Sequence, residues 1–286
     1  MKDQKIPGAS IAVVRSGKIV KAAAYGFANV EVGAPAKVET IFPAGSITKQ
    51  FTASAIMLLV EEGRVGLDDS IGKYFPEAPA TWRAITIRHL LTHTSGIPEI
   101  FGSTEENVYT KGVIDFHREY TEDELARAYF AQPLDFDPGT KWNYSNAGYE
   151  MLGFLIHRVT GQYYGDFFRE RFFNPLGMKT ATIFSYTEII PQRANGYDLV
   201  NGAWKNTHMW QTVSTLSNAE GSLLMSVLDL AKWDGALNTE QILKRSSLET
   251  MYTPLPIDDG SAYPSGMGWF IAKANGHRSS TQIGHS

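Results

Sequence analysis

The sequence contains no cysteine, no excess of basic residues and no long apolar run; its formal net charge is -4. The lack of cysteine excludes disulfides, thiolate metal ligands and a cysteine nucleophile, although a cysteine-free chain suits any redox compartment. The negative charge gives no electrostatic basis for binding nucleic acid or an anionic membrane surface. The apolar runs fall far short of the ~20 residues of a membrane-spanning helix. We therefore expect a soluble globular protein with no membrane or nucleic-acid partner.

Several motifs that would define other classes of protein are missing or incomplete. Gly-rich phosphate loops do not occur, so no cofactor is predicted. His89 and His93 have a metal-like spacing, but Leu90 stands where a zincin motif needs glutamate, and a metal site is not expected. The final Gly-His-Ser could begin the nucleophile elbow of an α/β-hydrolase, but the acid and histidine that should follow it do not. The N-terminal stretch has no signal-peptide architecture, and the localisation stays undetermined.

Two Ser-x-x-Lys motifs are present, and their surroundings differ. Ser70 and Lys73 flank Gly72 and follow a turn-like stretch, so we expect a solvated loop there. Ser46 and Lys49 come directly before an apolar run that stops at Gly63, a pattern that predicts a buried helix. Residues three apart on a helix are neighbours on one face, which would place the Ser46 hydroxyl beside the Lys49 amine. Taken alone, however, the motif favours a structural interpretation, in which a helix cap is followed by a surface lysine.

Strands are predicted near both ends of the chain and helices between them. Residues 9–15 and 18–25 form a hairpin pattern around Ser16-Gly17, and residues 268–273 with the Asn275-Gly276 turn form a second one. Helical periodicity prevails from about residue 42 to 160, including a capping box at Thr121. We expect an α+β fold in which one antiparallel sheet, built from both chain ends, is flanked by helices. The whole chain is predicted to be one catalytic domain, with an α/β part (about 1–63 and 200–286) and a mostly helical part (64–199).

A second motif, Tyr144-Ser145-Asn146, precedes another helix pattern that ends at Gly161. Alone, it indicates only that Asn146 caps the helix while Tyr144 packs against it. Together with Ser46-x-x-Lys49 and the C-terminal His285-Ser286, it resembles the motifs of the serine β-lactamase and penicillin-binding protein superfamily. The resemblance is strongest to the branch of class C β-lactamases, D-aminopeptidases, D-alanyl carboxypeptidases and family VIII esterases. Segments such as IFPAGSITKQFTA, ITIRHLLTHTSGI and FDPGTKWNYSNAGYEMLG extend it over nearly the whole chain.

The resemblance implies a β-lactamase/transpeptidase-like fold and a serine hydrolase that acts on an ester or amide through an acyl-enzyme. Ser46 would be the nucleophile, Lys49 the base that takes its proton, and Tyr144 the group that carries the proton to the leaving group. Asn146 would donate its amide to the substrate or to Lys49. The alternatives that share the fold are a penicillin-binding sensor without turnover and an acyltransferase. Tyr144 favours turnover.

The third motif departs from the family pattern in two ways. The family has Lys or His, then a small residue and glycine, whereas this chain shows His285-Ser286 and stops. We therefore expect the C-terminal strands to be missing, the chain to be truncated, and another chain to be a possible source of the missing segment; the oligomeric state is not predicted. With His285 and Ser286 as substrate-binding residues, a largely neutral imidazole replaces a fixed cation. That exchange favours uncharged esters or amides over β-lactams.

Overall fold

The computed structural model describes residues 5–100, 114–115, 118–207, 218–257, 260, 263–274 and 276–284. The α-helices of these residues are α1 (Thr48–Glu61), α2 (Ile87–Leu91), α4 (Glu122–Phe130), α5 (Asn146–Thr160), α6 (Tyr164–Phe168), α7 (Asn174–Leu176), α9 (Val227–Leu237) and α10 (Arg245–Met251). Shorter turns are η1 (Gly45–Ile47), η2 (Ile71–Lys73) and η3 (Ala80–Ala84), all 3₁₀, and the π-helical η4 (Arg169–Phe173).

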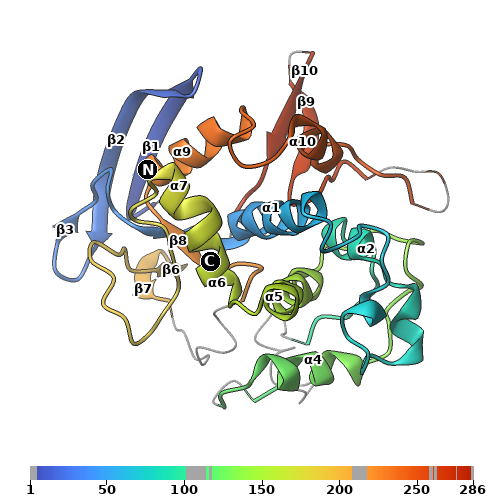
Figure 1. The fold of residues 1–286 in the computed structure, drawn as a ribbon. Helices are drawn as coiled ribbons and strands as arrows, with labels where there is room; N and C mark the ends of the chain where they lie inside the picture. The colour runs from blue at the N-terminus through green and yellow to red at the C-terminus, as the bar shows by residue number, and fades with distance from the viewer. Residues whose placement is uncertain are drawn as a thin grey trace.

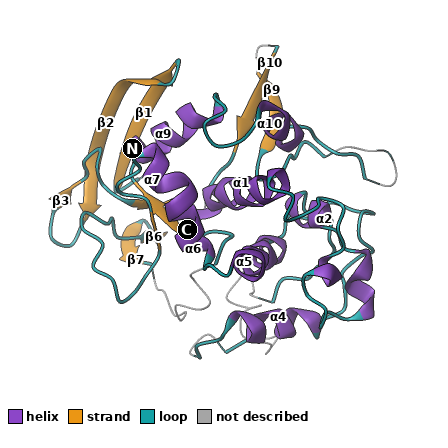
Figure 2. Cartoon of the chain, in the orientation of Figure 1, coloured by secondary structure: helices purple, strands orange, loops and turns teal. Residues whose placement is uncertain are grey.

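The strands are β1 (Gly8–Arg15), β2 (Lys18–Asn29), β3 (Ala34–Pro35), β4 (Phe42–Pro43), β5 (Thr182–Ile183), β6 (Tyr197–Val200), β7 (Ala203–Asn206), β8 (Leu223–Met225), β9 (Phe270–Ala274) and β10 (His277–Thr281). Strands lie mainly toward the two ends of the chain and helices dominate its middle (Figure 2). The predicted α+β class is confirmed.

The two predicted hairpins form, but they do not share one sheet within the described residues. β1 pairs antiparallel with β2, which also pairs with β3, while β9 pairs with β10 and with no other described strand. Ser16 and Gly17 both have positive φ at the first turn, as a tight hairpin requires. A separate antiparallel ladder, β4-β8-β5, lies beside the start of α1. The expectation of a single sheet from both chain ends is therefore corrected to separate ladders, and the division of the domain into two parts stays a prediction.

Helix α1 lies at the centre of the molecule, with the β1/β2 hairpin and α9 on one side and α2, α4 and α5 on the other (Figure 1). Its burial follows from its composition, because the apolar run has no polar face to present to water. Phe51 stacks on Trp233 of α9 at 3.9 Å between ring centroids. This packing fixes the helix that carries Lys49, and the predicted buried helix is confirmed.

The second Ser-x-x-Lys motif is a short 3₁₀ helix rather than the expected loop. Ser70 caps η2 by accepting a hydrogen bond from the Gly72 backbone N–H, and its hydroxyl donates to the Arg83 carbonyl. Lys73 points to solvent and pairs with Asp69 at 2.7 Å. The Ser70 and Lys73 side chains thus have separate structural roles.

Within the described part of the chain, no helix is both long and apolar enough to cross a membrane.

Candidate active site

Ser46 lies in η1, the single 3₁₀ turn that leads into α1. Thr48, two residues further along the chain, fixes the turn: its Oγ1 donates to the Gly45 carbonyl at 2.7 Å and accepts from the Leu223 N–H of β8 at 3.1 Å. Because α1 is buried and the turn is tied to β8, the half-buried Ser46 hydroxyl has a fixed position. The prediction that Ser46 begins a buried helix holds, with a 3₁₀ turn in place of the first α-helical turn.

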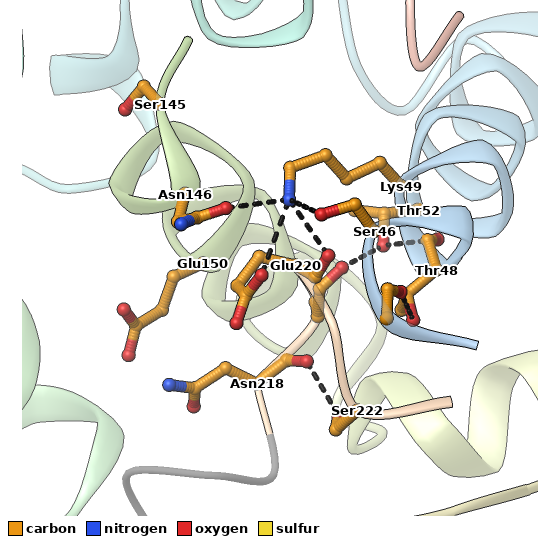
Figure 3. Close-up of polar contacts among 12 residues, drawn as sticks. Ser46, Thr48, Lys49, Thr52, Ser145, Asn146, Glu150, Asn218, Glu220 and Ser222 are labelled. Atoms are coloured by element: carbon orange, nitrogen blue, oxygen red, sulfur yellow. Dashed lines mark hydrogen bonds and ion pairs between the residues drawn. The ribbon is translucent and has the colours of Figure 1, made fainter. Parts of the chain in front are cut away.

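Lys49 is completely buried and is surrounded by hydrogen-bond acceptors (Figure 3). Its Nζ lies 3.3 Å from Ser46 Oγ, 2.7 Å from Asn146 Oδ1 and 2.9 Å from the Glu220 carbonyl oxygen. A Glu220 carboxylate oxygen lies 3.3 Å away as a fourth acceptor. The snorkelling surface lysine that the isolated motif allowed is therefore excluded by the burial of Lys49.

Tyr144 contacts the same hydroxyl of Ser46. Its phenolic O–H donates to Ser46 Oγ at 2.7 Å, and its ring centroid lies 4.9 Å from Lys49 Nζ. The ring is held between the stacked imidazole of His93, at 4.6 Å, and Phe270 of β9, at 6.4 Å. The fold thus brings the Tyr144 phenol into contact with the same Ser46 oxygen that the Lys49 amine contacts, although Tyr144 is almost a hundred residues away in sequence.

Asn146 is not the cap of α5, and this frees its side chain for Lys49. The N-cap is Ser145, whose hydroxyl accepts from the Gly148 N–H at 3.0 Å. The backbone N–H groups of Asn146 and Ala147 donate to Glu99 Oε1 at 2.7 and 3.1 Å. Burial is the main reason that the pKa of Glu99 is raised. Because Glu99 and Ser145 accept hydrogen bonds from the first backbone N–H groups of α5, the Asn146 amide oxygen is available to orient the lysine.

His93 supports the site through its contacts with Ser145 and Tyr144. Its Nδ1 accepts the Ser145 N–H at 3.0 Å, and its ring is buried beneath Tyr144. Burial, reinforced by the charge of Lys49, lowers the pKa of His93 to about 3, so the imidazole is neutral at physiological pH. His89 Nδ1 instead accepts from the Thr86 N–H at the start of α2. The described residues contain no cluster of three or more His, Asp or Glu suited to a metal ion.

Glu220 is the site residue that the sequence did not reveal. It contacts Lys49 through both its carbonyl and its carboxylate, and it lies in the segment that leads into β8. That segment is tied to α1 by Thr52, whose hydroxyl donates to the Ala219 carbonyl at 2.5 Å. An isolated glutamate before a glycine carries no recognisable pattern, so only the folded chain shows its role.

The C-terminal segment after β10 returns to the start of α1. Gln282 Nε2 donates to the Ser46 carbonyl oxygen at 3.0 Å, and a Cβ on Gly284 would lie only 1.9 Å from the Ala44 carbonyl oxygen. The segment 282–284 therefore passes in direct contact with the Ser46 turn. His285 and Ser286 themselves lie outside the described residues.

The comparisons with known proteins agree with this fold and these motifs. The Beta-lactamase family matches residues 1–286, and the chain belongs to that family. Among curated relatives, the putative penicillin-binding protein PbpX of Bacillus subtilis (strain 168) is 32% identical over 260 residues, which cover 91% of this chain and 61% of the relative. Protein flp of Staphylococcus aureus (strain MW2) is 30% identical over 275 residues, covering 93% of this chain and 52% of its own length. The chain thus spans between half and two thirds of these relatives.

Solved structures give the same result. The octameric penicillin-binding protein homologue from Pyrococcus abyssi superposes with a TM-score of 0.80 at 31% identity, covering 97% of this chain and 64% of its own. D-amino acid amidase from Ochrobactrum anthropi SV3, complexed with L-phenylalanine amide, gives a TM-score of 0.81 at 28% identity. The superposition covers 99% of this chain and 81% of the amidase chain. The expected β-lactamase/penicillin-binding protein fold is therefore confirmed, and the relatives support a hydrolase of this superfamily.

Proposed function

We propose that this protein is a serine hydrolase that cleaves an ester or amide through an acyl-enzyme on Ser46. The observation that carries the proposal is the simultaneous contact of Lys49 Nζ and Tyr144 OH with Ser46 Oγ. A serine hydroxyl becomes a nucleophile when an adjacent group can take its proton, and that base needs a third group to orient it. Asn146 supplies that orientation through its 2.7 Å contact with Lys49.

In the proposed reaction, Ser46 Oγ attacks the substrate carbonyl carbon while its proton moves to Lys49. The backbone N–H of Ser46, at the start of a helix, is a donor for the oxyanion that forms. Tyr144 then gives a proton to the leaving oxygen or nitrogen as the carbonyl–leaving-group bond breaks, and Lys49 replaces that proton. A water molecule attacks the acyl-enzyme by the same route in reverse. Each proton thus travels between groups that already contact Ser46.

The substrate class is proposed to be a small neutral ester or amide. The relative named D-amino acid amidase supports amides in particular. The test is a parallel assay with short-chain p-nitrophenyl esters, D-amino-acid amides and a chromogenic cephalosporin. We expect measurable turnover of at least one ester or amide that Ser46→Ala abolishes, and turnover that survives in Ser46→Ala would contradict the proposal.

His285→Lys should shift the substrate preference toward β-lactams. At the position where lysine is expected to hold a substrate carboxylate, imidazole gives no permanent cation, and one charge-assisted hydrogen bond is worth about 1.5 to 3 kcal/mol. In the transition state, this difference equals about tenfold to somewhat over a hundredfold in rate. The measurement is the ratio of kcat/KM for a cephalosporin to that for a p-nitrophenyl ester, in both proteins. A wild-type protein that prefers the cephalosporin, or an unchanged ratio in the variant, would refute the prediction.

A further inference from the structure

Lys49 can act as a base only after it has lost its own extra proton, and its burial restricts where that proton can go. The side chain is 0% exposed, so water cannot take the proton directly. Among the described residues, the four acceptors that contact its Nζ are a hydroxyl oxygen, two carbonyl oxygens and one carboxylate oxygen. Hydroxyl and carbonyl oxygens are not protonated near neutral pH, whereas a carboxylate is a true base. The Glu220 carboxylate is therefore the available acceptor.

The position of Glu220 suits this task. Its Oε2 lies 3.3 Å from Lys49 Nζ, and its side chain is 29% exposed, so it has access both to the buried amine and to solvent. The backbone on both sides is fixed by polar contacts: Ser222 Oγ donates to the Asn218 carbonyl at 2.6 Å and contacts the Tyr164 hydroxyl at 2.7 Å. The carboxylate is thus held at the amine by the fold itself.

Among the described residues, Glu220 is the one carboxylate or imidazole that makes a hydrogen bond or ion pair with Lys49 Nζ, so the other acidic and histidine side chains nearby cannot take this proton directly. His93 is neutral, because burial and Lys49 lower its pKa to about 3. Glu150 is buried, accepts the Tyr129 hydroxyl, and has a pKa raised well above its ordinary value by burial. Burial also raises the pKa of Glu99, which is occupied with the start of α5. The other ionisable neighbours that the structure describes are the phenols of Tyr129, Tyr144, Tyr149 and Tyr164.

We propose that Glu220 is a positioning residue that accepts the proton of Lys49 and so prepares the lysine to act as the base for Ser46. In this step a Lys49 N–H bond breaks and a Glu220 Oε2–H bond forms, and the ion pair becomes a neutral pair with no change in net charge. Burial disfavours charged forms, which reduces the cost of this exchange relative to water. The neutral Lys49 then takes the Ser46 proton as Oγ bonds to the carbonyl carbon. After water has hydrolysed the acyl-enzyme and Ser46 Oγ has regained its proton, Glu220 returns its own proton to Lys49.

This inference rests on the proposed acyl-enzyme function and predicts a particular pH dependence. With Glu220 present, neutral Lys49 forms by transfer of a proton within the Lys49–Glu220 pair. Because the pair as a whole neither gains nor loses a proton, the extent of this transfer does not depend on pH. Without the carboxylate, Lys49 must release its proton to solution, so the neutral fraction rises tenfold for each pH unit until the lysine is deprotonated. A purely structural role of Glu220 would change the rate equally at every pH.

The test is the pH profile of kcat/KM for a p-nitrophenyl ester, between pH 5.5 and 10, in wild type and Glu220→Gln. Glutamine keeps the shape and one acceptor oxygen but cannot take the proton. We expect a flat wild-type profile, and a variant that is at least about tenfold slower at pH 6, rises with unit slope and approaches wild type at high pH. Glu220→Asp, which retains a carboxylate, should keep the flat profile at a reduced rate.

The matched control is Glu77→Gln, which removes the same charge from the exposed ion pair with Arg158 and should leave the profile unchanged. A uniform loss at every pH, a flat profile in Glu220→Gln, or a faster reaction at neutral pH would overturn the inference. The last result would mean that the carboxylate keeps Lys49 protonated. Labelling of Ser46 by a fluorophosphonate, measured in each variant, distinguishes these outcomes from a failure of the proposed function, because that function requires the label in wild type.

Discussion

Replacing Lys49 with alanine should slow acylation of Ser46 by about a hundred- to ten-thousand-fold, the usual effect of removing a general base. The amine is the basic group that the site places at the serine hydroxyl, 3.3 Å from Oγ. Its removal also leaves the Glu220 carboxylate without its charged partner, but that side chain is 29% exposed and can reach water. The measurement is the rate of the p-nitrophenol burst, with circular dichroism as the check on folding.

Two companion variants separate the possible contributions of the lysine. Lys49→Met fills a similar volume without a base and should be as slow as Lys49→Ala, which would exclude a packing defect as the cause. Lys49→Arg retains the positive charge but cannot be deprotonated. We expect it to remain slow. A fast arginine variant would show that Lys49 acts as a fixed charge, and a folded alanine variant with nearly normal acylation would make the lysine structural.

Tyr144→Phe should lower turnover of an amide by about a hundredfold or more, because the leaving nitrogen loses its proton donor. The effect should be smaller for a p-nitrophenyl ester, whose leaving group departs without protonation. The substitution removes only the hydroxyl that lies 2.7 Å from Ser46 Oγ. The ring contacts with His93 and Phe270 remain, so the melting temperature should change little.

The comparison of kcat for both substrates in wild type and Tyr144→Phe checks this prediction. Equal losses for the amide and the ester would refute a role in leaving-group protonation and would instead indicate that the phenol orients Ser46. An unchanged amide rate would remove Tyr144 from the mechanism altogether.

Local patterns in the sequence were sufficient for the elements that build the site. The apolar run after Lys49 predicted a buried helix, and α1 is buried. Thr121 and Glu124 form the predicted reciprocal capping box at α4. Gly161, with φ of 75°, ends α5 where the pattern placed its end. These features depend on residues close together in sequence, so they can be recognised without the tertiary structure.

The features that sequence reasoning missed depend on contacts between distant segments. Asn146 and Ser145 are equally good caps by composition, and only the Lys49 amine, 97 positions away, determines that Asn146 faces the site. The ion pair between Lys49 and Glu220 spans 171 positions and follows no spacing rule. The pairing of strands from the two chain ends was likewise overestimated, since alternation of apolar residues predicts strands but not their neighbours.

The central claim, that Ser46 is the residue acylated during turnover, is tested most directly by peptide mapping after reaction with a fluorophosphonate. The probe should add one adduct per chain, on the peptide that contains Ser46, and Ser46→Ala should prevent it. Ser70, in the other Ser-x-x-Lys motif, is the internal control, because its hydroxyl is committed to the Gly72 N–H and the Arg83 carbonyl. An adduct on Ser70 or another serine, or no adduct in a preparation that hydrolyses substrate, would contradict the account.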